Sequence, residues 1–380
     1  MGKEVAVLDI GSSKLCFAVG SKNSIGVINV SSFSCETYQG YYESEFCDFE
    51  NLLDDVKRTI NASRIEKMPK TLYVSVPAEF SKVDTRTSYM NFGREKLITR
   101  QIIDELHKKG DKLDQNNEWV LISSSAINYT LDDQYSTLDP LGDRATHVSA
   151  TISYLYASDL FVRIFDSIAI ELGIESVKYV ISTWAVSSRF IDTEARKFGS
   201  LSLDIGFGST SLALVKGDGI ISQYTAPLGT GSIFDALARQ LDVDFEAALE
   251  LQKNVNLDFA MMEGAVYTVQ SNNRIKTFKA IDINNALKAR LDDIVDFIEN
   301  SIDQEPGVVS DSTPVYLTGG GISGIKGSVA YLEKKLKRRV KGRVAGVNGF
   351  DKPYFTSLIA LIDVAYEINE NQSIWNKLFN

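Results

Sequence analysis

One strand–loop–strand pattern occurs twice in this chain, about half its length apart. The first copy, "AVLDIGSSKLCFAVG", covers residues 6–20, and the second, "LSLDIGFGSTSLALV", covers residues 201–215. Each copy reads as an apolar strand, then Asp-Ile-Gly, a loop of small residues, and a second apolar strand. The anchor acids Asp9 and Asp204 lie 195 residues apart, so the pattern predicts two related α/β halves in a chain of 380 residues.

The two loops have the chemistry of an anion site. A Gly/Ser/Thr loop presents backbone N–H groups and hydroxyls with no bulky side chain in the way, which suits a phosphate. A third segment, "LTGGG" at residues 317–321, lets a nucleotide approach the backbone at the start of a helix. The expected nucleotide-binding residues are Asp9, Gly11, Ser12, Ser13, Lys14, Asp204, Gly206, Gly208, Ser209, Thr210, Gly229, Gly319, Gly320 and Gly321.

Asp9 and Asp204 are also the expected Mg²⁺ ligands, acting through water, since hydrated Mg²⁺ prefers carboxylate partners. The alternative for both acids is a purely structural role, in which they cap the turns that follow them. Lys14 reaches a β-phosphate in the nucleotide interpretation and is a solvated strand-end lysine otherwise.

Composition excludes several other classes of function. A net charge of −10 gives the chain as a whole no electrostatic reason to bind nucleic acid. His107 and His147 are the only histidines, which argues against a histidine-based metal site or catalytic dyad. The three cysteines, Cys16, Cys35 and Cys47, show no paired spacing, and Cys16 reads as a small buried residue. We expect a reduced, cytoplasmic protein, because residues 1–12 do not read as a signal peptide and no apolar run approaches twenty residues.

The intervening sequence divides the chain into five parts. The expected first domain covers residues 1–83 and 157–198, and a small α+β unit, residues 84–156, is inserted into it. The second domain covers residues 199–235 and 306–369 around a subdomain at residues 236–305, and residues 370–380 form a tail. Helices are expected at residues 49–60, 95–110, 160–173, 183–199 and 328–340, with Val329, Leu332, Leu336 and Val340 facing inward in the last.

The chain resembles the actin, sugar-kinase and heat-shock-chaperone superfamily, and within it the FtsA family of bacterial actin homologues. The matching segments are "LDIGSSKLCFAVG", "DPLGDRATHVSATISYLYAS", "LDIGFGSTSLALV", "PLG" and "YLTGGGISGI", in the family's order. The resemblance implies a duplicated actin-like (ribonuclease-H-like) fold, with two lobes around a nucleotide cleft and a small inserted domain. It also implies binding of ATP or ADP with Mg²⁺, self-assembly into protofilaments, and tethering of an FtsZ-like partner to the cytoplasmic face of the membrane.

The second loop departs from the family pattern Gly-Gly-Gly-Thr-Thr-Asp. Phe207 stands where a small residue is usual, Ser211 removes a carboxylate, and Thr230 replaces a second glycine after Gly229. Leu249 and Gln252 align with a Glu and a Lys that hold the ribose, although a slip of one residue would place Glu250 and Lys253 there. If the charged pair is lost, nucleotide binding is weaker, because each missing charge-assisted hydrogen bond costs about 1.5–3 kcal/mol. We also expect slow or absent hydrolysis of ATP.

The tail "ENQSIWNKLFN" carries apolar residues at helical spacing. Ile374, Trp375, Leu378 and Phe379 share one helical face that suits a membrane surface, or else the tail packs back on its own domain. The basic run at Lys334, Lys335, Lys337, Arg338, Arg339, Lys341 and Arg343 is a solvated helix end or a patch for anionic lipid.

The leading functional hypothesis is an ATP-binding, self-assembling adaptor that tethers a cell-division partner to the membrane. The alternative is a PilM-like scaffold that grips a membrane-machinery peptide in a pilus or secretion assembly. A small-molecule kinase is the third hypothesis, which the replacements at Phe207 and Ser211 weaken.

Overall fold

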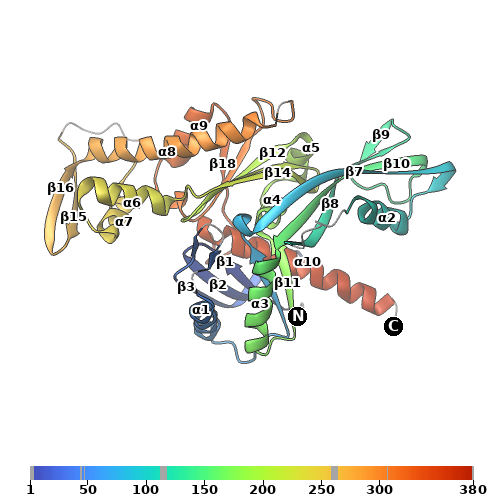
Figure 1. Cartoon of the computed structure of the whole chain (residues 1–380), viewed down its shortest axis with the longest axis horizontal. Helices are drawn as coiled ribbons and strands as arrows, with labels where there is room; N and C mark the ends of the chain where they lie inside the picture. Colours follow the sequence, from blue (N-terminus) through green and yellow to red (C-terminus); the bar gives the residue numbers. More distant parts are fainter. Residues whose placement is uncertain are drawn as a thin grey trace.

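The protein consists of three arms that meet at a central junction (Figure 1). A computed structural model describes residues 4–42, 45–46, 48–111, 118–257, 264–305 and 307–378. Within these ranges, no helix combines the length and apolar character that crossing a membrane requires.

The first half is built on a five-stranded sheet in the order β11-β6-β1-β2-β3. Its strands are β1 (Val5–Ile10), β2 (Lys14–Lys22), β3 (Ile28–Thr37), β6 (Thr71–Val76) and β11 (Ser176–Ile181). Its helices are α1 (Phe49–Ala62), α3 (Asp159–Glu171) and α4 (Ser182–Phe190), and a small hairpin pairs β4 (Tyr41–Tyr42) with β5 (Glu45–Phe46). Helix α5 (Thr193–Phe198) leads into the second half, where Arg196 donates to the Gly217 carbonyl oxygen at 2.9 Å. In α1, the apolar residues Leu52, Leu53, Val56 and Ile60 are buried, whereas Phe49 at its start is exposed.

The second half repeats this sheet in the order β14-β13-β12-β17-β18. Its strands are β12 (Ser200–Ile205), β13 (Thr210–Lys216), β14 (Gly219–Ala226), β17 (Val315–Thr318) and β18 (Val340–Gly342). The registers correspond as well, since Asp9 pairs with Cys16 in the first half and Asp204 pairs with Ser211 in the second. The duplication predicted from the repeated motif is therefore confirmed, and with it the actin-like α/β fold class.

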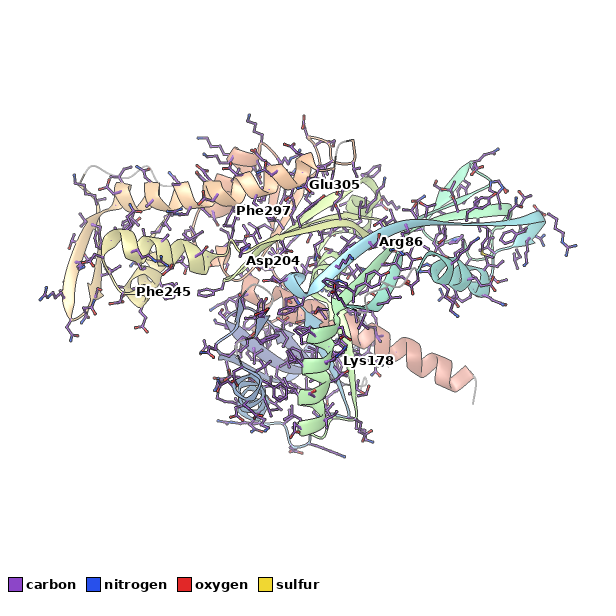
Figure 2. All side chains as sticks on the ribbon, in the orientation of Figure 1. Arg86, Lys178, Asp204, Phe245, Phe297 and Glu305 are labelled. Carbon is purple, nitrogen blue, oxygen red and sulfur yellow. A yellow bond between two sulfur atoms is a disulfide. The ribbon has the colours of Figure 1, made fainter. Side chains whose placement is uncertain are left out.

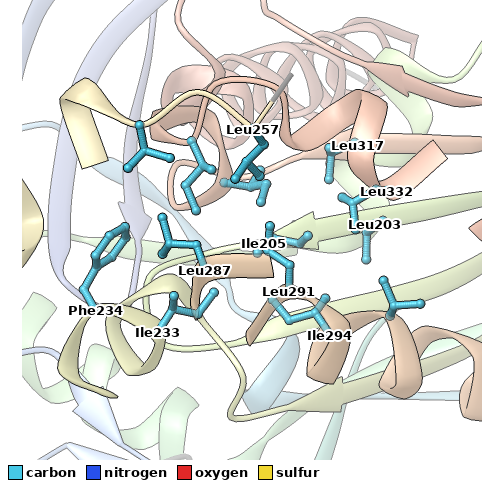
Figure 3. Close-up of a cluster of buried hydrophobic side chains, with 14 of the residues drawn as sticks. Leu203, Ile205, Ile233, Phe234, Leu257, Leu287, Leu291, Ile294, Leu317 and Leu332 are labelled. Carbon is cyan, nitrogen blue, oxygen red and sulfur yellow. The ribbon is translucent and has the colours of Figure 1, made fainter. Parts of the chain in front are cut away.

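A subdomain extends from the second half as the left arm of Figure 1. It contains α6 (Thr230–Leu241), α7 (Phe245–Asn254), the hairpin β15 (Val266–Ser271) and β16 (Arg274–Lys279), and the long helix α8 (Ala280–Asp303). One buried core joins this arm to the sheet: side chains of α6 and α8 pack on β12 and β17, and Leu332 of α9 (Ser328–Leu336) joins them (Figure 3). The apolar residues Leu203, Ile233, Leu287 and Leu291 lie at its centre.

The right arm of Figure 1 is a four-stranded sheet in the order β7-β10-β8-β9, covered by α2 (Arg100–Gly110). Its strands are β7 (Ser81–Leu97), β8 (Trp119–Leu131), β9 (Tyr135–Thr137) and β10 (Arg144–Ser158). This inserted sheet also contacts the second half, because Thr85 and Ser153 donate hydrogen bonds to the Ile220 carbonyl oxygen at 3.3 and 2.7 Å.

The final helix, α10 (Thr356–Leu378), returns the chain to the first half. Leu358, Ile359, Leu361 and Ile362 are buried in a core with β1 and β2. Lys22 at the end of β2 pairs with Asp363 at 2.5 Å, so a charged contact also fixes the helix to the sheet. The helix then continues beyond the sheet to Leu378, projecting from the body of the protein (Figure 1).

Three helix boundaries differ from the sequence-based expectation. The helix predicted at residues 95–110 begins only at Arg100, because β7 continues to Leu97 and Ile98 exchanges backbone hydrogen bonds with Asp143 and Gly142. The helix predicted at residues 183–199 is broken at Ile191, where Arg196 donates to the carbonyl oxygens of Ser188 and Ile191 that the break leaves free.

The third difference concerns the helix predicted at residues 328–340. It ends at Leu336, because Lys337 adopts a left-handed conformation with φ of 51°, and Val340 lies on β18 instead. Leu332, Leu336 and Val340 are buried as expected, whereas Val329 is exposed.

The expectation of unpaired cysteines is also wrong. Cys16 on β2 and Cys35 on β3 are joined by a disulfide, with Cα atoms 4.1 Å apart. The two residues are direct cross-strand neighbours in the antiparallel β2–β3 pair. Their separation of 19 residues does not reveal this, because the pairing depends on the turn between the strands and on a register shift at Val19–Gly20.

Candidate functional site

A cavity of about 280 Å³ lies where the two halves meet. We call it the central cavity; Figure 2 labels Asp204, one of its lining residues, close to the junction of the three arms. Its walls come from both small-residue loops, from the segment after β6, from the glycine segment after β17 and from the start of α10.

The two loops have the same turn geometry. Gly11 donates its backbone N–H to the Lys14 carbonyl oxygen at 3.0 Å, and Gly206 donates to the Ser209 carbonyl oxygen at 2.9 Å. The loops also meet directly, because the Gly208 N–H donates to Ser12 Oγ at 2.8 Å. Backbone and hydroxyl groups from both halves thus converge on one space, as two phosphate-binding loops would require.

The two anchor acids are held by equivalent hydroxyl groups. Ser75 on β6 donates to Asp9 Oδ1 at 2.8 Å, and Thr318 on β17 donates to Asp204 Oδ2 at 2.8 Å. Asp9 accepts a second hydrogen bond from Ser357 Oγ, also at 2.8 Å. Each half therefore fixes its acid with a side chain from the parallel strand beside it.

Burial dominates the electrostatics of these acids. Desolvation raises the pKa of Asp9, while the hydrogen bonds from Ser357 and Ser75 act in the opposite direction. Desolvation, reinforced by Glu79 and Asp9, raises the pKa of Asp204 to about 6, against the opposing effect of Thr318. A bound cation would lower the cost of keeping these carboxylates charged.

The donor set fits a hydrated Mg²⁺ ion. Among the described residues, no group of three or more His, Cys, Asp or Glu side chains is arranged to hold a metal directly. One buried carboxylate, Asp9, and one half-buried carboxylate, Asp204, line the same cavity and are suited to contacts made through the water shell that Mg²⁺ keeps.

The glycine segment requires its glycines for packing. A Cβ on Gly321 would lie 2.1 Å from the Gly206 carbonyl oxygen, and one on Gly319 would lie 2.2 Å from that of Ile205. Gly319 also adopts a φ of +112°, which side chains rarely allow. The segment is followed by a short 3-10 turn at Ile322–Gly324, and α9 begins only at Ser328, so no α-helix starts directly behind the glycines.

The structure brings most of the predicted binding residues to the central cavity. Asp9, Gly11, Ser12, Ser13, Lys14, Asp204, Gly206, Ser209, Gly319, Gly320 and Gly321 line it. Three others lie beside it: Gly208 meets Ser12, Thr210 donates from its buried hydroxyl to the Leu228 carbonyl oxygen, and Gly229 packs on Phe207. The side chains of Ile374, Trp375 and Leu378, and the whole of Phe379, lie outside what the structure describes.

The residues that depart from the family pattern also face the cavity. The cavity is lined by Phe207, Ser211, Leu249 and Gln252, the last two from α7. Gln252 Nε2 donates to the Gly321 carbonyl oxygen at 3.1 Å, and it is thus already engaged by the protein. Leu249 offers no polar group at all.

Sequence reasoning missed several residues of the cavity wall. Glu79 follows β6, lines the cavity and accepts a hydrogen bond from Ser209 across the two halves. Tyr354 and Ser357 come from the last segment, and Lys14 Nζ lies 5.4 Å from the centre of the Tyr354 ring. The strand "TLYVSVP" was a usable signal for Glu79, because the carboxyl ends of neighbouring parallel strands meet at one edge of a sheet.

Much of the basic run is engaged within the protein. Lys335 pairs with Asp292 at 2.9 Å, and Lys341 and Arg343 lie over the Tyr316 ring at 5.1 and 4.8 Å. Arg338 and Arg343 have acidic neighbours at 3.8 Å, Asp311 and Asp192. These contacts favour the interpretation as a solvated surface over a dedicated lipid patch.

The sheet duplication, the paired loops and the inserted unit define an actin-like fold. Among solved structures, the chain is similar to the PilM–PilN type IV pilus biogenesis complex, with a TM-score of 0.67, 17% identity, and 96% of this chain and 99% of the other covered. It is also similar to MreB5 of Spiroplasma citri bound to AMPPNP, with a TM-score of 0.60, 12% identity, and 99% of each chain covered.

Curated proteins with sequences similar to this chain share one name. The cell division protein FtsA of Bacillus subtilis is 21% identical over 94% of this chain and 82% of its own length. The cell division protein FtsA of Neisseria meningitidis serogroup B is 18% identical over 97% of this chain and 91% of its own length. No protein-family model matches the chain. The chain is thus similar to FtsA in sequence over most of its length and actin-like in fold.

Proposed function

We propose that the central cavity binds ATP or ADP together with Mg²⁺. The observation that carries this proposal is the meeting of two equivalent loops, one from each half, at a cavity that Asp9 and Asp204 also line. Gly11, Ser12 and Ser13 face one side of a polyphosphate, and Gly206 and Ser209 face the other. The MreB5 structure contains AMPPNP, which shows that a neighbour in fold holds a nucleotide.

Each residue has a defined part in this binding. Mg²⁺ neutralises phosphate charge, and Asp9 and Asp204 hold it through its water shell. Lys14 offers its ammonium group to a phosphate from the exposed start of β2. The glycines of residues 319–321 let the nucleoside approach the backbone closely.

The same cavity supports binding better than turnover. Phe207 is bulky where the loop is otherwise small, and Leu249 leaves the nucleoside without a charged partner. We propose ATP hydrolysis slower than about one per minute, far below the typical enzyme rate of about 10 per second. Titration with a fluorescent ADP analogue tests binding, and a phosphate-release assay tests turnover. The variant Asp204→Asn keeps the size of the side chain but removes its charge. We expect its affinity for the ADP analogue to lose the part that depends on Mg²⁺.

In the cell, we propose an adaptor that self-assembles and tethers an FtsZ-like partner to the cytoplasmic face of the membrane. The relatives named as cell division protein FtsA support this proposal. The tail supports it too, because Ile374, Trp375, Leu378 and Phe379 give apolar contact area for a lipid surface.

The energetics favour membrane binding by a polymer. Four half-buried apolar side chains contribute roughly 4–6 kcal/mol, and ordering a free tail would cost about 1–2 kcal/mol per residue. Helix α10 continues to Leu378, which removes part of that ordering cost. Many tails on one filament would add avidity to an interaction that is weak for a single chain.

A second candidate function is a PilM-like scaffold that grips a peptide from membrane machinery. The similarity to the PilM–PilN complex over 96% of the chain favours it. Electron microscopy of the full chain on lipid monolayers with ATP, beside a form ending at Ser373, separates the two. Ordered filaments from the full chain alone support the adaptor. Absence of both filaments and lipid binding favours the scaffold.

A further inference from the structure

Two bonded cysteines form part of the wall of the central cavity. Cys16 and Cys35 are direct cross-strand neighbours, their sulfur atoms are joined, and both residues line the cavity together with Lys14 and Tyr354. Cys16 is almost completely buried and Cys35 is half-buried, and both residues border the open space of the cavity.

The pair lies next to the elements that would hold a nucleotide. Cys16 pairs with Asp9 across β1 and β2, and it follows Lys14 by two residues on the same strand. Ser211 takes the corresponding place beside Asp204 in the second half. Each half therefore has a small residue beside its anchor acid, and in the first half this residue, Cys16, is bonded to a second cysteine.

The pair also belongs to the buried cluster beneath the last segment. Cys16 and Phe355 share this cluster, and Cys35 packs against it. Phe33, two residues before Cys35 on β3, contacts Phe350 and Phe355 edge-on at 5.0 and 5.3 Å between ring centres. A movement of the sulfur atoms away from the cavity would therefore meet packed aromatic side chains.

We propose that Cys16 and Cys35 are a reversible dithiol–disulfide pair whose state sets the nucleotide affinity of the central cavity. The proposal rests on the proposed nucleotide binding. The oxidant is a low-molecular-weight disulfide such as oxidised glutathione. One cysteine thiolate attacks it and releases one glutathione thiol, and the other cysteine then attacks the protein sulfur of the mixed disulfide and releases the second. Two cysteine thiols are oxidised to one disulfide, and one glutathione disulfide is reduced to two thiols.

Reduction changes the wall of the cavity for a steric reason. Bonded sulfur atoms are about 2 Å apart, whereas two thiols must separate to van der Waals distance, roughly 3.5–4 Å. The aromatic cluster resists this movement, because close-packed interiors do not yield readily. The cavity is open space, so at least one thiol moves into it, toward Lys14 and Asp9. Reduced protein is expected to bind ADP five- to tenfold more weakly than oxidised protein.

The test uses the full chain carrying Cys47→Ser, which removes the third thiol and prevents its exchange with the pair. The protein is equilibrated with oxidised glutathione or with dithiothreitol, and its state is verified by alkylation and intact mass. Affinity is then measured with a fluorescent ADP analogue. In the same background, Cys16→Ser and Cys35→Ser are matched controls that are expected to bind equally in both buffers, since neither can form the bond.

Tighter binding by the oxidised pair, absent in both controls, supports the inference. Equal affinity in the two verified states overturns the inference while leaving the proposed function intact. Failure of oxidised glutathione to form the bond also overturns it. Loss of ADP binding in every state overturns the proposed function and this inference together.

Discussion

Ser357, in the first turn of the last helix, donates a hydrogen bond to Asp9 in the first strand, with the oxygen atoms 2.8 Å apart. These residues are separated by 348 positions in the sequence. The contact joins the wall of the central cavity to α10, which packs under the first sheet and then extends to Leu378. Asp9 therefore contacts the first turn of the helix that extends to Leu378.

Ser357→Ala tests this contact. The substitution leaves a buried carboxylate with one hydroxyl donor instead of two, and we expect the free energy of unfolding to fall by about 1–3 kcal/mol. Denaturant unfolding measures the loss. Ser167→Ala on α3 is the matched control, because Ser167 donates only to the Arg163 carbonyl oxygen of its own exposed helix. Equal effects of both substitutions would show that the Asp9 contact contributes nothing to stability.

Asp204→Asn tests the cost of burying a carboxylate. The folded-state pKa of about 6 lies above the unfolded value, so the folded protein binds this proton more tightly. The resulting stabilisation is complete below about pH 4 and is lost as pH rises through 6. Asparagine keeps an acceptor for Thr318 without the charge, so the variant is expected to be more stable than the parent protein by about 1–3 kcal/mol at pH 7.5.

Unfolding at pH 7.5 and at pH 4, with EDTA present, provides the measurement. The advantage of the asparagine variant should shrink at pH 4, where the parent protein holds Asp204 protonated. An advantage that is the same at both pH values would contradict the raised pKa. Asp311→Asn is the control, because the side chain of Asp311 is fully exposed.

The sequence predicts the sheets and their loops better than it predicts the contacts between separate helices and strands. The repeated Asp-Ile-Gly segments identify both sheets and the loops at their ends, because apolar strands and small-residue turns are local patterns. The break at Ile191 escapes such reasoning, since it depends on Arg196 donating to carbonyl oxygens of another helix. A helical pattern contains no sign of that partner.

The candidate site shows the same contrast between local motifs, which the sequence reveals, and contacts between separate segments. Loop glycines and anchor acids are visible as motifs, whereas the Ser357–Asp9 contact and the Cys16–Cys35 bond arise from pairings between separate segments. Strand register decides such pairings, and a shift of one residue reverses the direction of every side chain. One sequence does not reveal that register.

Gly321→Ala tests the close approach of the glycine segment to the second loop. The new Cβ would lie 2.1 Å from the Gly206 carbonyl oxygen, which is backbone and does not move aside cheaply. We expect a loss of stability of about 1–3 kcal/mol and a weaker affinity for ADP. Gly342→Ala is the matched control, since its Cβ would meet only Val329 Cγ2 at 3.8 Å. Unchanged ADP affinity in Gly321→Ala would show that the glycine segment does not contribute to ADP binding.

Leu249→Glu tests whether the cavity has lost a nucleoside contact. Leu249 lines the cavity, and in the first of the two alignments given above it stands where the FtsA family offers a carboxylate. A charge-assisted hydrogen bond contributes about 1.5–3 kcal/mol. The glutamate is therefore expected to tighten ADP binding by about tenfold or more. Titration with a fluorescent ADP analogue measures the change. Leu249→Gln, which has the same length without the charge, should gain clearly less. If glutamate and glutamine give the same affinity as leucine, the nucleoside does not reach α7, and the weak binding must originate at Phe207 and the second loop instead.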